Sequence, residues 1–311
     1  MLTDVAGVSH IGRRKAKNED SYGVFDEKQP GLRLFQQGML VAVADGLGGH
    51  IGGDIASKLA VSLVKDMLRE DPPQEADRDS EREDAYYLEL IERLMLRANE
   101  SIYKTNLDLV KGKRPMGTTL CVALIRPRQI YLGNVGDSRA YLFRNGRFVA
   151  QTTDHSWVDE QVKQGLMTQA QAEKDKRKNL LTRSIGTHPE IEVDTYQWRS
   201  EAGDQLLLCT DGLINMVPDG SIAQILNKPL MAQEKANTLV DMANENGGRD
   251  NITVVLSTIN PDKRQLQRLK RQAWLKENSH NIKTSVYVAL YGLVCLLIGY
   301  IMGNVLPFNS S

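Results

Sequence analysis

The stretch MLVAVADGLGGHIGG (residues 39–53) places a carboxylate at the end of an apolar run. Six apolar residues lead directly into Asp45, and glycine occupies five of the next eight positions. A buried carboxylate is costly unless it is paired or binds a metal, and clustered glycines let the backbone approach another group closely. A single Asp-Gly of this kind is usually a strand-to-helix turn, so other parts of the chain must decide between a turn and a metal site.

An Asp beside an apolar run, with a Gly or Asn neighbour, recurs in three further segments: DQLLLCTDG (204–212), GGRDNITVVLS (247–257) and YLGNVGDSRAYLF (131–143). Turn signals around short apolar runs place Asp211, Asp250 and Asp137 at strand ends. Like charges that converge on one edge of a sheet need a cation. Oxygen ligands without His or Cys spacing favour Mg²⁺ or Mn²⁺ over zinc. We therefore predict a divalent-metal centre with Asp45 as a ligand.

Hydrophobic periodicity divides the 311 residues into helices and strands. Helical spacing predicts long helices over 53–69, 86–110 and 232–245, and a polar helical segment over 156–178. The charged, proline-containing stretch 70–84 is predicted to be a solvated loop. Between them, short strands with close turns favour antiparallel pairing. This order predicts an α+β layered sandwich. The 39 basic and 39 acidic residues balance, so no global field indicates nucleic acid.

The C-terminal segment differs from the rest. SVYVALYGLVCLLIGYIMGNVL (285–306) contains no Asp, Glu, Lys, Arg or His, and as a helix it would extend about 33 Å, enough to cross a hydrocarbon core of about 30 Å. A buried helix of a soluble domain is the alternative. Residues 263–283 carry seven basic side chains against one acid, which predicts a single-pass inner (cytoplasmic) membrane protein with its N-terminal domain in the cytoplasm. Gly299 and Gly303 form a GxxxG pair that favours a homodimer, although glycines are common in membrane helices.

Eight short motifs follow one another along the chain: KNEDS (17–21), DGLGGH (45–50), GTT (117–119), GNVGDSRAY (133–141), TTDHS (152–156), LTRSIGT (181–187), CTDGL (209–213) and GGRDNIT (247–253). Their order is similar to that of the metal-dependent protein phosphatases, the type 2C family of Ser/Thr phosphatases, over about residues 4–258. The resemblance implies four layers, with two antiparallel sheets between helix pairs. It predicts a phosphatase domain over 1–260, a basic linker over 261–283, a transmembrane helix over 284–306 and a tail over 307–311.

The resemblance also implies a set of metal ligands. Asp45 would bridge two ions, and the carbonyl of Gly46 would bind one of them. Asp211 and Asp250 resemble the ligands of the first ion, so these three aspartates are the expected catalytic residues. Two ions sharing a water would deliver hydroxide to phosphorus without a protein nucleophile. Asn251 is expected to orient the ligands.

Three further acidic residues have weaker assignments. Glu19 or Asp20 would support the second ion, partly through water, and Asp137 resembles the residue that holds a third ion in bacterial members. Residues 156–178 resemble the variable flap near the site. The sequence leaves open whether Mn²⁺ or Mg²⁺ is used.

Two positions depart from the family pattern. The Arg that binds the substrate phosphate is replaced by Lys15, which supplies charge without forked geometry, so either Lys15 or the neighbouring Arg14 takes this role. Leu47 stands where eukaryotic members have a His that is the proposed general acid, so the general acid of this chain is unassigned. His50 is not at that position, and we expect it to have a structural role.

Three functional classes are compared. The first is a membrane-anchored phosphatase that acts on phosphoproteins and opposes a bacterial Ser/Thr kinase. A silent phosphoprotein-binding module would be expected to lack a ligand Asp, whereas all three are present. A two-metal nuclease would need a basic groove with aromatic side chains, and the sequence offers none.

Overall fold

The structure, a computed structural model, describes residues 4–26, 38–47, 52–70, 80–109 and 115–259, and three isolated residues beyond them. These five ranges lie in a compact unit, Met1–Asp262. The predicted transmembrane helix and tail, together with His50, lie outside the described residues, and the three isolated residues are the only described part of the predicted linker. Among the residues described, no helix is both long and apolar enough to cross a membrane.

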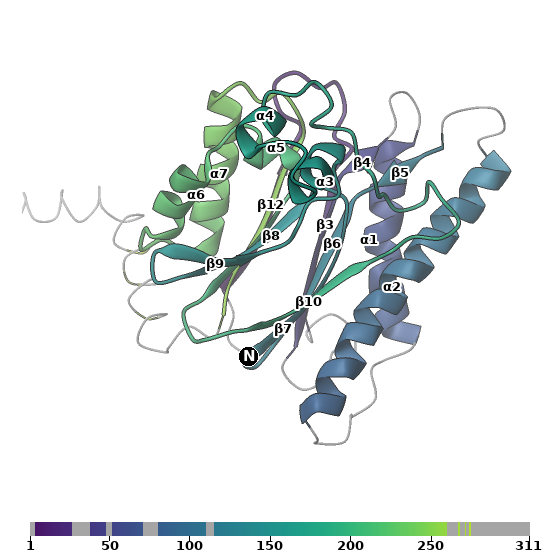
Figure 1. Cartoon of the computed structure of the whole chain (residues 1–311). Coiled ribbons are helices and arrows are strands. Elements are labelled where there is room, and N and C mark those ends of the chain that lie inside the picture. Colours follow the sequence, from purple (N-terminus) through teal and green to yellow (C-terminus); the bar gives the residue numbers. More distant parts are fainter. Residues whose placement is uncertain are drawn as a thin grey trace, which may run out of the picture. The chain divides into compact units, whose positions relative to one another are not determined.

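Ten strands of the described part form two five-stranded antiparallel sheets (Figure 1). The first has the order β1 (Asp4–His10), β12 (Ile252–Thr258), β11 (Gln205–Cys209), β8 (Arg139–Arg144) and β9 (Arg147–Gln151). The second has the order β10 (Asp194–Arg199), β7 (Gln129–Val135), β6 (Leu120–Arg126), β3 (Met39–Ala44) and β2 (Ser21–Asp26). A short pair, β4 (Gly46–Leu47) and β5 (Gly117–Thr118), extends one end.

Side-chain alternation along β3 explains why the two sheets pack face to face. Val41 and Val43 belong to the core between the sheets, whereas Leu40, Ala42 and Ala44 belong to the core beneath the helices. Because successive side chains of a strand point to opposite faces, an uninterrupted apolar run indicates a strand covered on both sides. All six residues of β3 are accordingly buried.

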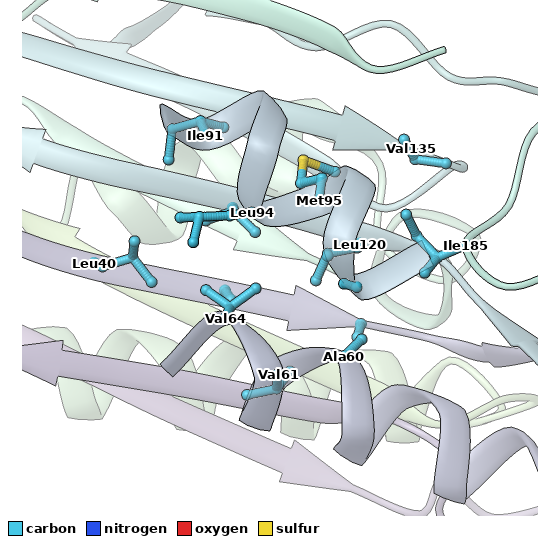
Figure 2. Close-up of a cluster of buried hydrophobic side chains, with 14 of the residues drawn as sticks. Leu40, Ala60, Val61, Val64, Ile91, Leu94, Met95, Leu120, Val135 and Ile185 are labelled. Atoms are coloured by element: carbon cyan, nitrogen blue, oxygen red, sulfur yellow. The ribbon is translucent and has the colours of Figure 1, made fainter. Parts of the chain in front are cut away.

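Helices α1 (Gly53–Glu70) and α2 (Ser80–Leu109) cover the second sheet. Leu40 lies with Val64 of α1 and Leu94 of α2 in this core (Figure 2). The helix expected over 53–69 is confirmed. The helix expected over 86–110 begins earlier, at Ser80, in a charged segment read as loop.

The first sheet is covered by α5 (Asp211–Ile214), α6 (Asp219–Leu226) and α7 (Ala232–Glu245). The prediction for α7 is confirmed to the residue. The flap-like segment holds only two short helices, α3 (Trp157–Lys163) and α4 (Gln169–Ala172), rather than continuous helix, because Gly165 adopts a positive φ between them. The two sheets and their helical covers confirm the predicted four-layer α+β sandwich.

Candidate metal centre

The predicted ligand residues lie at one end of the two sheets. Asp45 follows β3, and Asp137 lies in the turn between β7 and β8. Asp211 follows β11, and Asp250 precedes β12. Because β11 is antiparallel to β12 and β8, its end lies beside the start of each of them. Both β3 and β7 are antiparallel to β6, so they end at the same edge of the second sheet. In Figure 1, β4 and α5, which begin at the ends of β3 and β11, lie at the same end of the sandwich.

Asp45 is held through its backbone. Its carbonyl accepts hydrogen bonds from the Thr119 N–H at 2.8 Å and the Thr118 hydroxyl at 2.8 Å, and its N–H donates to Thr119 Oγ1 at 2.9 Å. Burial raises the pKa of the Asp45 carboxyl well above its ordinary value, and the charges of Asp20, Asp211, Asp137 and Asp250 raise it further. The backbone of Asp45 is therefore held at a place where negative charges converge.

Asp211 has one engaged and one free carboxylate oxygen. Its Oδ2 accepts a hydrogen bond from Asn215 Nδ2 at 3.0 Å, whereas the buried Oδ1 has no hydrogen-bond partner among the described residues. Burial, followed by the charge of Asp250, raises the pKa of Asp211 to about 6. A buried acceptor without a donor costs free energy, which a cation at Oδ1 would offset.

Asp20 shows the same asymmetry. Its side chain is only 6% exposed, and Oδ2 accepts from the Thr210 hydroxyl at 2.8 Å, while Oδ1 has no partner in the described part of the chain. Burial raises the pKa of Asp20 to about 7. Glu19 is more open; its backbone carbonyl accepts from the Gly46 N–H at 3.2 Å.

Gly46 lies where only glycine fits. A Cβ at this position would stand 2.2 Å from the carbonyl oxygen of Gly53 and 2.6 Å from that of Glu19. Both distances are below 3.0 Å, closer than a Cβ atom comes to another atom in real structures, so the close approach of three backbone segments excludes a substituent. Steric crowding therefore explains why a glycine follows Asp45.

Lys15 and Arg14 have different surroundings. The Lys15 ammonium lies 2.6 Å from Asp250 Oδ1. Burial alone would lower the pKa of Lys15, but hydrogen bonding to Asp250 and the charge of that carboxylate raise it above its ordinary value. Arg14 is exposed. Of these two candidates for a phosphate contact, Lys15 is the one beside the carboxylates.

Asn251 braces the segment that carries these residues. Its Nδ2 donates to the carbonyls of Ile11 and Lys17, both at 2.9 Å, and its Oδ1 accepts from the Glu19 N–H at 2.8 Å. The amide thus joins the start of β12 to the loop between β1 and β2. The side-chain amide fixes the loop that bears Lys15 and Glu19, and the backbone N–H of Asn251 donates to Asp250 Oδ1 at 2.8 Å.

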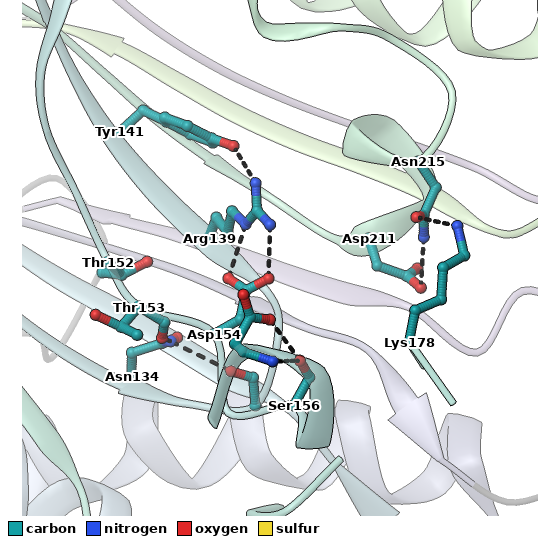
Figure 3. A network of polar contacts seen from close by, with 12 residues as sticks. Asn134, Arg139, Tyr141, Thr152, Thr153, Asp154, Ser156, Lys178, Asp211 and Asn215 are labelled. Carbon is teal, nitrogen blue, oxygen red and sulfur yellow. Dashed lines mark hydrogen bonds and ion pairs between the residues drawn. The ribbon is translucent and has the colours of Figure 1, made fainter. Parts of the chain in front are cut away.

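Two further contacts were not anticipated from the sequence, and Figure 3 shows the first of them, between Arg139 and Asp154. Arg139 Nε and Nη2 donate to the two oxygens of Asp154, each at 2.7 Å, and this forked pair lies beside the Asp137 turn. Within the same turn, the Gly136 N–H donates to His155 Nδ1 at 3.2 Å, and the His155 N–H donates to the Gly136 carbonyl at 2.9 Å. The motif TTDHS therefore holds the turn, a role that spacing alone could not reveal.

A cleft of about 590 Å³ opens beside the centre. Asp137 and Asp211 line it together with the flap-like segment and the region around α5. The cleft thus gives solvent access to the carboxylates of Asp137 and Asp211, and it leaves room for a substrate.

The donor set fits divalent cations. Among the described residues, no three His, Cys, Asp or Glu side chains form a ready metal cage, but Asp45, Asp211, Asp250 and Asp20 supply oxygen donors, two of which are buried without partners. Oxygen donors suit Mg²⁺ and Mn²⁺. Cys121 and Cys209 are buried, and burial raises the pKa of both thiols, which argues against a thiolate nucleophile.

Comparison with known proteins identifies the class. The family described as Protein phosphatase 2C matches residues 6–257. The serine/threonine phosphatase stp of Listeria innocua is 38% identical over 250 residues, which cover 79% of this chain and 91% of that protein. The solved structure of the S. agalactiae serine/threonine phosphatase has 32% identity and a TM-score of 0.70, covering 83% of this chain and 100% of that one.

A third relative was solved with metal. The catalytic domain of the serine/threonine protein phosphatase PstP, described in complex with two manganese ions, has 31% identity and a TM-score of 0.67, covering 82% of this chain and 97% of that one. The fold and these matches define a phosphoprotein phosphatase. The chain belongs to the protein phosphatase 2C family, as a Ser/Thr protein phosphatase of the bacterial type.

Proposed function

We propose that this phosphatase hydrolyses phosphoserine and phosphothreonine in proteins with two divalent ions, Mn²⁺ or Mg²⁺. Asp45, Asp211, Asp250 and the Gly46 carbonyl would hold these ions, supported by Glu19 or Asp20. Asp137 would hold a third ion. When bound, the ions would supply Lewis acidity that acidifies water and draws charge from the phosphoryl oxygens. The observation that carries this proposal is the pair of buried, unpartnered oxygens, Asp20 Oδ1 and Asp211 Oδ1.

The chain's own residues have complementary roles. Lys15, beside Asp250, would bind the phosphoryl group once cations compensate that carboxylate. The Arg139–Asp154 pair and His155 hold the turn of Asp137, and the cleft admits the phosphorylated side chain. The manganese ions of the PstP catalytic domain support the choice of metal.

This proposal predicts that phosphothreonine-peptide hydrolysis requires Mn²⁺ or Mg²⁺ and stops in EDTA. Asp45→Asn, Asp211→Asn and Asp250→Asn should each lower kcat by at least about 10²-fold, because each removes a charge from the metal centre. Asp241→Asn, at an exposed position of α7, is the matched control and should leave kcat unchanged. Full activity in EDTA, or a preference for an oligonucleotide, would contradict the proposal.

We also propose that the chain opposes a bacterial Ser/Thr kinase from the cytoplasmic face of the inner membrane. The apolar segment 285–306 and the basic residues of 263–283 support a single-pass anchor. The full chain should then remain with membranes after alkaline carbonate washing, whereas a chain ending at residue 283 should not. Release of the full chain by the wash would contradict the anchor.

The GxxxG pair supports a homodimer of this segment, since small residues allow two helix backbones to approach closely. In an in-membrane association assay, residues 284–311 should dimerise, and Gly299→Ile with Gly303→Ile should abolish the signal. Equal signals from the two sequences would leave a plain anchor.

A further inference from the structure

The two carboxylate oxygens of Asp211 have different hydrogen-bonding environments. Asn215 lies one turn after Asp211, at the C-cap of α5, and contacts it twice. Its backbone N–H donates to the Asp211 carbonyl at 2.8 Å, and its Nδ2 donates to Asp211 Oδ2 at 3.0 Å. A side-chain hydrogen bond at i,i+4 restricts the rotation of the carboxylate, which leaves the buried Oδ1 as the free donor atom.

A residue of the flap-like segment contacts the oxygen of the Asn215 amide. Lys178 Nζ lies 3.4 Å from Asn215 Oδ1, and Figure 3 shows the chain of contacts from Lys178 through Asn215 to Asp211. An ammonium group can only donate, so the oxygen of the amide must face Lys178. The NH₂ group is thereby directed toward Asp211.

The three residues come from two separate parts of the fold, because Asp211 and Asn215 belong to α5 and its C-cap. Lys178 follows α4, 37 positions before Asn215 in the sequence, and both residues line the cleft with Asp211. Asn215 and Lys178 are exposed, so neither side chain is needed to fill the core. The contacts therefore link the flap-like segment to a candidate metal ligand at the cleft wall.

We infer that Asn215 is a positioning residue that holds Asp211 Oδ1 ready for a divalent cation, and that Lys178 sets the orientation of its amide. This inference rests on the proposed function, because it concerns the affinity of the same centre. It assigns neither residue as a ligand. Its consequence is that the position of the flap-like segment affects metal affinity through Lys178.

The test measures Mn²⁺ affinity by calorimetry on the full chain. Loss of a group that orients a ligand typically weakens metal binding by about 10–100-fold, so Asn215→Ala should raise the Kd for Mn²⁺ by about 10-fold or more. At saturating Mn²⁺, the KM for a phosphopeptide should stay near that of the unsubstituted chain. Lys178→Met should raise the Kd by a smaller factor, about 2- to 5-fold, since it acts through Asn215.

A double-mutant cycle gives the sharper result. If Lys178 acts through Asn215, adding Lys178→Met to Asn215→Ala should change the Kd no further. Asn237→Ala is the matched control, because Asn237 is an exposed amide that accepts an i,i+4 hydrogen bond from Gln233 on α7. Its Kd should equal that of the unsubstituted chain.

Three outcomes would overturn the inference: an unchanged Kd in Asn215→Ala, an equal loss in Asn237→Ala, or additive effects of Lys178→Met and Asn215→Ala. Thermal melting of the metal-free proteins checks folding, and Asn215→Ser replaces Asn215→Ala if the latter melts early. Absence of Mn²⁺ binding by the unsubstituted chain would instead contradict the proposed function itself.

Discussion

Lys15 and Arg14 are adjacent in sequence and carry the same charge, yet only Lys15 lies beside a carboxylate of the centre. Its ammonium contacts Asp250 at 2.6 Å, a position from which it could exchange this carboxylate for a phosphoryl oxygen once cations are bound. Lys15 is therefore better placed than Arg14 to contact the substrate phosphate.

Lys15→Ala should raise the KM for a phosphopeptide by about 10-fold or more, because a hydrogen bond to a charged group contributes about 1.5–3 kcal/mol. Lys15→Arg should preserve or improve kcat/KM through a forked contact. Arg14→Ala is the matched control and should change little. A silent Lys15→Ala together with a damaging Arg14→Ala would transfer the role to Arg14.

Residue types at strand ends carried most of the information about the site. The aspartates at 45, 137, 211 and 250 were predicted from their place beside apolar runs, and the structure brings them to one end of the sandwich. Lys178 could not be predicted, because its contact with Asn215 depends on how the flap-like segment folds back. The i,i+4 spacing of Asp211 and Asn215 is visible in the sequence. It predicts a contact between them only if a helix begins at Asp211, and the structure was needed to show that helix.

Among the elements, α2 shows why a charged stretch was misread. Glu83 and Asp84 belong to a segment whose charge and prolines indicate loop, yet both lie in the helix. Arg126 of β6 pairs with Glu83 at 2.8 Å, and the Tyr131 hydroxyl of β7 donates to Asp84. Tertiary partners on the sheet therefore extend the helix beyond its apolar pattern, which a periodicity argument cannot detect.

Lys235 joins three elements on the other side of the molecule. It lies on α7, is 6% exposed, and donates from Nζ to Gln205 Oε1 of β11 at 2.7 Å and to the Leu226 carbonyl at the end of α6 at 2.6 Å. Burial lowers the pKa of Lys235 to about 8. A free lysine titrates near 10.4.

This depressed pKa predicts that stability rises with pH in the alkaline range. Between about pH 8 and 10.4 the unfolded chain binds more protons at Lys235 than the folded one, so raising the pH increases the free energy of unfolding, by about 3 kcal/mol in total. Lys235→Met should lack this contribution. Chemical denaturation of both metal-free proteins from pH 7.5 to 10 measures the difference, and parallel curves would contradict it.

At the scale of the whole molecule, the arrangement of layers positions the centre. Two antiparallel sheets meet face to face through residues such as Val41 and Leu208, which places the ends of β3 and β11 from opposite sheets within electrostatic reach of each other. The layered sandwich followed from short strands with close turns between predicted helices, and its four layers were implied by the family resemblance. The pairing of particular strands did not, since nothing in the sequence specifies that β1 lies beside β12.

The central claim is that these sheet ends hold divalent cations between Asp45, Asp211 and Asp250. The most direct measurement is a crystal structure of the full chain with Mn²⁺, in which anomalous scattering at the manganese edge locates each ion. The account predicts two strong peaks within about 2.0–2.3 Å of oxygens of these three aspartates. Manganese found only elsewhere, or no peak among these carboxylates at saturating Mn²⁺, would contradict it.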